Sequence, residues 1–564
     1  MGLPGTPELA GRLHELKERS ARSYADLAAD CGISTSTLHR YCRGQVLPDS
    51  YGLVERIARA CGAERAELAE LYRLWERADA VRSAARQASA AETSTIAGSN
   101  NAAHGAGPTL PSPVRPSRPP RQQTRLLRWF AALGCLLIVV TLSTTASSPT
   151  WHTGRTTAQD VSGPTWSQYP ATVPGAFYGV TMNNSSGEMP DFRVGAVRLW
   201  DSETRWAQVE PARGRYDWRV PDRLVDGARK ARLPVLYTFG GTPSWAAPDA
   251  PLGPYFDGSR AAPPDNLDDW VRFTRAVATR YAGRITAYEL WVLAPSPHFF
   301  TGDAATLARM TQRAGAVIRQ ADPDATVVCP SIGDLWEPAS QRFLRDFAAA
   351  GGYQACDVAG VKLYPRRDGD PPESFVRLAQ VIDRTFHTAG VRPRLWNTGT
   401  TYRIPEDRPL SRARAVAYAT RFYLIGMYLR YDRMYFYNWG GTKIPLVLQA
   451  AGGAPTAAAR AVDTLQRWLA GARITACGQG PSDGLPDRVW ECRYLLTAAS
   501  DHPAGPAVVR WTESGTALMP ADRGAHTVRS LDGTSVPAPA RLRITEQPQL
   551  ITLSAEVGSD VRPW

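Results

Sequence analysis

The sequence contains very little lysine, and this shortage says more about its source than about its activity. Lysine occurs only as Lys17, Lys230, Lys362 and Lys443 in 564 residues, whereas arginine is abundant. This composition is typical of a high-GC genome, and we expect an actinobacterial source. The formal net charge of +12 therefore comes from arginine. Its uneven placement along the chain argues against a uniformly basic nucleic-acid-binding protein.

Metal-binding patterns are missing as well. The chain has no CxxC pair and no His-rich spacing, so we expect no structural zinc, no other metal site and no cofactor. Apolar residues are scarce in two segments. We interpret residues 81–128 as a disordered Pro/Arg-rich linker and residues 147–170 as a polar stalk. The linker carries much of the basic excess.

Long uncharged runs are also rare, and the exception lies at residues 129–146. A helix of this length spans ~27 Å, close to the hydrocarbon core of a bilayer. Arg121, Arg125 and Arg128 precede the run, and the next basic residue is Arg155. The sequence therefore predicts a single transmembrane helix in a single-pass type II protein of the cell membrane, with a cytoplasmic N-terminus and an extracellular C-terminus. A buried core helix and a cleaved signal peptide are the alternatives.

The first 80 residues read as a bundle of helices. Ser23 is placed to cap one helix, Gly32 supplies a tight turn, and a second short helix ends near Gly44. Leu27 and Leu38 are spaced to pack these two helices together. With its LAxxxGIS frame, this domain resembles the helix-turn-helix domain of the phage-repressor (Cro/C1-like, XRE) family.

The resemblance implies that the second helix of the motif enters the major groove of DNA. The residues that would contact base edges or phosphates are Thr35, Ser36, Thr37, His39, Arg40 and Arg43. Residues 1–80 carry eleven basic and twelve acidic side chains, so non-specific attraction to phosphate should be weak. A cytoplasmic protein partner, a vestigial domain and plain exposed polar residues remain open as alternatives. A homodimer would present two such helices to two half-sites.

Strand-like and helical stretches alternate through residues 171–472. The expected strands are 177–181, 196–200, 235–239, 287–292, 326–329, 358–363, 394–397 and 434–437. The expected helices are 221–231, 266–282, 303–320, 338–350, 373–388, 410–429 and 456–470. Eight strands in repeated strand–helix units predict a (β/α)8 TIM barrel, with functional residues at the C-terminal ends of the strands. Residues 473–564 lose the helical pattern and predict a small β-sandwich, which residues 160–174 would join.

Aromatic residues gather where the expected barrel strands end. Flat rings bind sugars by covering their apolar C–H faces, so these positions predict a site for an extracellular glycan. The candidate carbohydrate-binding residues are Trp200, Trp245, Trp291, Tyr364 and Trp439. The alternative is that these rings pack inside the barrel. For Trp291 and Trp439, packing and carbohydrate binding are equally open.

The stretches VRLWDSETRWAQVEPARGRYDW (197–218) and TPSWA (242–246) resemble the clan A glycoside hydrolases of the beta-xylosidase and alpha-L-iduronidase type. The resemblance implies a retaining mechanism with two catalytic glutamates, at the ends of the fourth and seventh strands. Leu293 and Gly399 stand at those positions, and neither can transfer a proton or form a glycosyl ester. Lys362 also replaces a frequent histidine. We therefore expect no catalytic residues in this pseudoenzyme and a barrel that binds carbohydrate or cell-wall glycan without hydrolysis.

Two alternatives to this reading stay open. An active hydrolase would need other acids near the strand ends, and the candidates are Asp201, Glu203, Asp303 and Asp334. A cell-envelope scaffold would use its helix-turn-helix domain to bind protein. The four cysteines beyond residue 300 allow two disulfides in an oxidising compartment. Local pairing would join Cys329 to Cys356 and Cys477 to Cys492.

Overall fold

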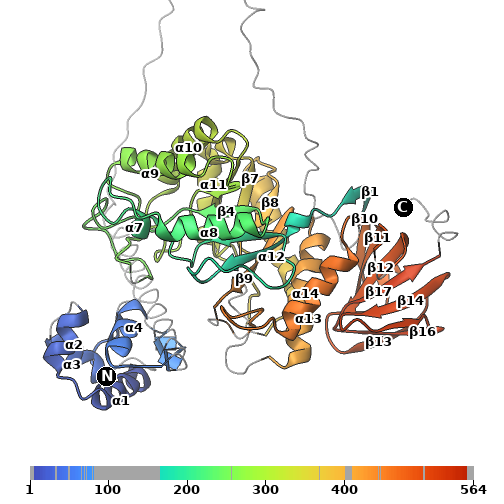
Figure 1. Cartoon of the computed structure of the whole chain (residues 1–564), viewed down its shortest axis with the longest axis horizontal. Coiled ribbons are helices and arrows are strands. Elements are labelled where there is room, and N and C mark those ends of the chain that lie inside the picture. The colour runs from blue at the N-terminus through green and yellow to red at the C-terminus, as the bar shows by residue number, and fades with distance from the viewer. Residues whose placement is uncertain are drawn as a thin grey trace, which may run out of the picture. The chain divides into compact units, whose positions relative to one another are not determined.

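The structure is a computed structural model with two compact units, residues 1–157 and 158–564 (Figure 1). It describes residues 6–31, 35–48, 51–64, parts of 67–81, 166–255, 257–367, 369–399, 410–441, 444, 446–499 and 502–554. The expected linker (81–128) and most of the expected stalk (147–170) lie outside the described residues.

The first unit contains short helices around a small apolar core. They are α1 (Thr6–Arg19), α2 (Tyr24–Cys31), α3 (Thr35–Cys42) and α4 (Tyr51–Ala60), followed by helical positions between 67 and 81. The Ser23 hydroxyl accepts the backbone N–H of Asp26 at 3.1 Å, which caps α2 as expected. Leu13, Leu27 and Leu38 are fully buried where α1, α2 and α3 meet.

Eight parallel strands form a closed barrel in the second unit. In chain order they are β2 (Tyr178–Met182), β3 (Ala196–Leu199), β4 (Val235–Thr238), β5 (Ala287–Glu289), β6 (Thr326–Ile332), β7 (Val358–Val361), β8 (Leu395–Asn397) and β9 (Arg433–Trp439). The barrel closes where β2 pairs with β9. The expected eight-stranded barrel is thus confirmed.

Helices follow the barrel strands. They are α7 (Trp206–Val209), α8 (Arg219–Lys230), α9 (Leu267–Arg280), α10 (Ala304–Ala321), α11 (Pro338–Ala349), α12 (Phe375–Thr388), α13 (Arg412–Tyr428) and α14 (Ala457–Trp468). Short 3-10 turns lie at Gly175–Phe177, Gly352–Ala355, Pro372–Ser374 and Pro481–Asp483. Each long helix buries an apolar face, as Trp270 and Phe273 of α9 illustrate.

Two antiparallel sheets complete the second unit (Figure 1). The larger has seven strands in the order β1-β10-β11-β12-β17-β14-β15, and the smaller pairs β13 with β16. Their bounds are β1 (Trp166–Thr172), β10 (Arg473–Gln479), β11 (Val489–Leu496), β12 (Gly505–Thr512), β13 (Thr516–Pro520), β14 (Ala525–Ser530), β15 (Ser535–Pro537), β16 (Arg541–Thr545) and β17 (Gln549–Leu553). The strand β1 comes before the barrel in the sequence, and the other strands of the larger sheet come after it.

Hydrogen bonds fasten this sheet to the barrel. The buried Arg421 of α13 donates to the carbonyl oxygen of Thr512 at 2.7 Å, and the Trp511 indole donates to Glu373 at 2.8 Å. Two disulfides are present: Cys329–Cys356 joins β6 to the segment before β7, and Cys477–Cys492 joins β10 to β11.

The structure overturns one element of the predicted fold class. None of the helices in the described ranges is long and apolar enough to cross a membrane, and the predicted segment 129–146 lies outside those ranges. The longest described helix, α10, has 18 residues but carries Arg309, Arg313 and Arg319, and guanidinium groups are costly in a lipid interior. The single transmembrane helix and the type II localisation built on it are therefore corrected.

Candidate functional site

The α3 helix presents a polar face in the first unit. Thr35, Ser36 and Arg40 are exposed, and Thr37 and His39 are partly exposed. Leu38, Tyr41 and Cys42 point into the core instead. Arg43 is exposed in the turn that follows the helix. The residues that the sequence proposed for DNA contact thus share one side of α3 and its C-terminal turn.

One of these residues is held against the neighbouring helix. The His39 ring stacks on the ring of Tyr24 in α2, with centroids 3.7 Å apart and planes at 18°. The Lys17 ammonium lies 4.6 Å above the same tyrosine ring. Burial raises the pKa of Tyr24 to about 12, so this tyrosine stays neutral and apolar. His39 therefore helps to join α2 to α3, and a base contact would have to use its outer edge.

Four other arginines among the described residues of this unit form ion pairs. Arg12 contacts Glu70 at 3.1 Å, and Arg19 contacts Glu67 at 2.6 Å. Arg22 pairs with Asp30, and Arg59 pairs with Glu55. Within the described part of the unit, Arg40 and Arg43 have no such partner. Part of the unpaired positive charge among the described residues of this nearly neutral domain therefore lies on α3 and its C-terminal turn.

Inside the barrel, a buried carboxylate lies at the end of β5. Glu289 is fully buried and accepts hydrogen bonds from Arg198 at 2.7 Å, Thr238 at 2.8 Å and Thr398 at 2.7 Å. The Lys362 ammonium lies 3.5 Å from its second oxygen and donates to the carbonyl and hydroxyl oxygens of Thr398 at 2.8 Å. These residues come from β3, β4 and β5 and directly after β7 and β8, so the barrel itself assembles the cluster.

The cluster shifts the pKa of both of its central groups. Burial alone would raise the pKa of Glu289, but Arg198 and then Lys362 outweigh it and lower the pKa to about 2. Burial and then Arg198 lower the pKa of Lys362, Glu289 opposes them, and the net pKa is about 7. Glu289 is therefore a permanent anion at neutral pH, and Lys362 titrates near neutrality.

A second group of polar residues lies beside this cluster. The Tyr437 hydroxyl donates to Asp201 at 2.6 Å, and Arg205 lies 3.7 Å from the other oxygen of Asp201. Arg205 also donates to Asp257 at 2.6 Å and lies 3.7 Å above the ring of Tyr255. Tyr255 and Asp257 come from a long segment after β4 whose sequence showed no periodic pattern, so the sequence did not indicate them.

Leu293 and Gly399 both lie near the carboxyl ends of the strands. Leu293 has a positive φ of 53° and packs in a small apolar cluster with Trp200 and Val292. Gly399 has a φ of 112°, and a Cβ placed there would lie 3.2 Å from the Thr181 hydroxyl and 3.9 Å from Arg198 Nη1. Leu293 thus has apolar neighbours, and the groups nearest to Gly399 include a hydroxyl and a guanidinium.

The predicted carbohydrate-binding aromatics are mostly enclosed. Trp291 and Trp439 are buried; the Trp291 indole donates to the carbonyl oxygen of Phe299 and the Trp439 indole donates to Gln449. Trp200 is buried and donates to Tyr255 at 2.8 Å. The hydrogen bonds of Tyr364 to Asp334 and of Trp245 to the Glu210 carbonyl orient the remaining two rings. Of the five, only Trp245 is partly exposed.

No group of His, Cys, Asp or Glu in the described ranges is arranged to hold a metal ion. The described mouth of the barrel contains cations, hydroxyls and rings together with the carboxylates of Glu289, Asp201 and Asp257. Such a set can bind polar ligands by hydrogen bonds and charge, but it offers Glu289 little freedom to act as an acid or a nucleophile.

The two units resemble different known proteins. Residues 8–71 match a family described as "Helix-turn-helix domain". The chain is similar in structure to a family 39 glycoside hydrolase from Bacteroides cellulosilyticus, with a TM-score of 0.50 and 14% identity over 68% of this chain and 82% of that one. A family 39 beta-xylosidase from Caulobacter crescentus gives a TM-score of 0.47 and 12% identity over 69% and 98%.

A xylanase 10B from Thermotoga maritima gives a TM-score of 0.36 and 13% identity over 52% of this chain and 98% of its own length. No curated protein matches the sequence. The first unit therefore contains a helix-turn-helix domain, and the second has a barrel fold like that of glycoside hydrolases.

Proposed function

We propose that the helix-turn-helix domain binds DNA through α3 and that the barrel binds carbohydrate without hydrolysing it. The observation that carries the second half of this proposal is the state of Glu289. All of its charge and hydrogen-bonding capacity is engaged by Arg198, Lys362 and two threonines. The domain limits of 1–80, 171–472 and 473–564 belong to the same proposal.

The requirements of retaining glycoside hydrolysis support a barrel that binds carbohydrate without hydrolysing it. This mechanism needs an acid with a raised pKa and a nucleophilic carboxylate ~5–5.5 Å from that acid. A pKa of about 2 leaves Glu289 with no proton to donate. Its lone pairs point to fixed donors, so attack on a sugar would require breaking several buried hydrogen bonds. Binding makes no such demand, because ligand hydroxyls can pair with groups such as Asp201 and Tyr437 at the rim.

The DNA-binding half is supported by the placement of charge. Arg40 and Arg43 have no ion pair with the described residues of the unit; Arg40 lies on the polar face of α3 and Arg43 in the turn that follows it. Two exposed arginines give a weak phosphate term, so specific recognition would depend on two copies reading two half-sites as a dimer.

An electrophoretic shift with genomic fragments selected by the purified protein tests the first half. Arg40→Ala should weaken binding about tenfold, since a charge-assisted hydrogen bond contributes ~1.5–3 kcal/mol. Arg59→Ala is the matched control, because Arg59 pairs with Glu55 on α4, and it should bind as the wild type does. Selection of proteins but of no DNA fragment would overturn the assignment in favour of a protein partner.

Aryl glycosides and a glycan array test the second half. The protein should release no aryl group, yet retain defined glycans on the array, and Trp245→Ala should reduce that retention. Turnover that disappears in Asp201→Ala would show an active hydrolase and refute the proposal. The exposed Glu337→Gln serves as a control for both assays.

A further inference from the structure

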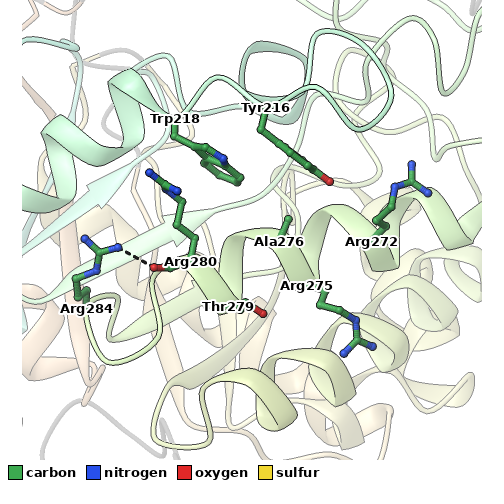
Figure 2. Close-up of a pocket in the computed structure, with 8 residues that line it drawn as sticks. All are labelled: Tyr216, Trp218, Arg272, Arg275, Ala276, Thr279, Arg280 and Arg284. Carbon is green, nitrogen blue, oxygen red and sulfur yellow. Dashed lines mark hydrogen bonds between the residues drawn. The ribbon is translucent and has the colours of Figure 1, made fainter.

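A groove with a volume of about 620 Å³ lies on the barrel unit between one face of α9 and the segment that leads into α8 (Figure 2). Two aromatic residues and four arginines dominate its lining: Tyr216, Trp218, Arg272, Arg275, Arg280 and Arg284. The two rings extend from the segment before α8 toward α9, and the arginines come from α9 and the turn after it. The size is that of an ordinary ligand site.

The aromatic side of the groove is ordered by its own contacts. The rings of Tyr216 and Trp218 stack with centroids 5.0 Å apart and planes at 17°. The Arg280 guanidinium lies 5.0 Å from the Trp218 ring, and the Tyr281 ring meets Trp218 edge to face at 6.0 Å. Both Tyr216 and Trp218 are nevertheless partly exposed. A ligand therefore meets a preformed apolar wall and need not order it on binding.

The arginines differ in how far their charge is neutralised. Arg280 donates to both oxygens of Asp222, at 2.8 and 2.5 Å, which fixes its position. Arg284 donates to the carbonyl oxygen of Arg280 at 2.7 Å, as the dashed line in Figure 2 shows. Arg275 is exposed and has no ion pair with the described residues. Arg275 thus contributes a charge that only solvent or a ligand can balance.

Arg272 places a second, partly neutralised charge about one helical turn away. Its side chain is 40% exposed and lies 2.8 Å from Asp269 and 3.9 Å from Glu210. Those two carboxylates are almost completely buried, at 2% and 0% exposure. The Arg272 Nη2 atom contacts both of these acids, and the rest of the side chain remains accessible in the lining of the groove. A ligand therefore encounters cations at the surface even though acids lie close behind them.

We propose that this groove binds an acidic polysaccharide. Its carboxylate groups would pair with Arg272 and Arg275, and its sugar rings would pack on the Tyr216–Trp218 wall. A planar guanidinium matches a carboxylate with two parallel hydrogen bonds. From Arg272 to Arg280 the helix rises ~12 Å, which is a row suited to a polymer and longer than a single anion requires.

The buried and flanking acids argue against a more densely charged polymer such as nucleic acid. Carboxylates lie within 4 Å of three of the four arginines, at Asp222, Asp226, Asp269 and Glu210. They offset much of the positive charge, so a polyphosphate gains little here. This site is separate from the Glu289 cluster and does not depend on the function proposed for the barrel mouth.

Isothermal titration of the full chain with oligogalacturonate, and with its neutral methyl ester, tests the proposal. The acidic oligosaccharide should bind and the ester should not. Arg275→Ala should weaken binding about tenfold, as expected for one charge-assisted pair. Arg342→Ala replaces an exposed arginine on α11 and should leave the affinity unchanged.

Three results would overturn this assignment. The first is equal binding of the acidic oligosaccharide by Arg275→Ala and by the wild type. The second is binding of the methyl ester as tightly as the acid. The third is tighter binding of polyphosphate or DNA than of oligogalacturonate, with that binding lost in the Arg275→Ala variant. Because Arg275 is exposed, its replacement should leave the circular dichroism spectrum unchanged, so loss of binding reports on the groove.

Discussion

Replacing Glu289 by glutamine should destabilise the barrel strongly while changing its shape little. The side chain is fully buried and sits between Arg198 and Lys362, which are each only 2% exposed. Glutamine keeps the volume and can still pair with the Thr238 and Thr398 hydroxyls, but it removes the only charge that faces Arg198 at 2.7 Å. Leaving one member of a buried ion pair uncompensated costs ~3–5 kcal/mol.

Urea denaturation followed by near-ultraviolet circular dichroism measures this loss. With an m-value of about 3 kcal/mol/M, the midpoint should fall by about 1–1.7 M. Glu337→Gln makes the same chemical change at an exposed site and should leave the midpoint where it is. Lys362→Met should cost far less than Glu289→Gln, because it keeps the Arg198–Glu289 pair and removes a buried charge.

The pH dependence sharpens the same prediction. The pKa of Glu289 is lowered from 4.5 to about 2, so its stabilising contribution is present above pH 4.5 and is lost as the pH falls toward 2. The gap between wild type and Glu289→Gln should therefore close over that interval. If the two proteins unfold at the same urea concentration at pH 7, the buried ion pair does not stabilise the barrel and the reasoning is refuted.

Three further outcomes can be checked in the same way. Because the pKa of Lys362 falls from 10.5 to about 7, wild type should gain stability relative to Lys362→Met as the pH rises from 7 toward 10.5; a constant difference in free energy of unfolding would contradict this. Opening the Cys329–Cys356 bond, which closes a loop of 27 residues, should cost about 3.5 kcal/mol in chain entropy, and a double serine variant with an unchanged urea midpoint would exclude it. Tyr24→Ala removes the ring under His39 and should lower the thermal midpoint of the first unit by a few degrees, an effect equivalent to ~1 kcal/mol, with His39→Ala having a similar effect.

The barrel could be predicted from local pattern because each strand and helix depends on residues close in sequence. The expected strand 235–239 and helix 303–320 correspond to β4 (Val235–Thr238) and α10 (Ala304–Ala321). Short apolar runs separated by amphipathic stretches leave few alternatives to a parallel sheet covered by helices. The same local reasoning placed Ser23 at the start of α2. It also predicted a membrane-spanning helix from composition alone, and that element is the one corrected.

The functional surfaces depended on contacts between residues far apart in sequence. Glu289 is hydrogen-bonded to Arg198, 91 residues away in sequence, and to Thr398, 109 residues away. A periodic pattern in the sequence cannot predict such contacts. Whether Trp291 lines a cleft or packs in the core was likewise undecidable, since a ring at a strand end serves either purpose until its neighbours are placed.

The sequence by itself determined the helix-turn-helix frame and the eight-stranded barrel, and it predicts that Leu293 and Gly399 replace two expected acids. Only the tertiary structure decided which charges are neutralised and which remain available. Arg40 and Arg275 look like any other arginines in the sequence, yet Arg59 and Arg280 form ion pairs and these two form none with the residues that the structure describes. The reason is that helical and strand periodicity acts over a few residues, whereas burial and ion pairing are set by elements that meet only when the chain folds.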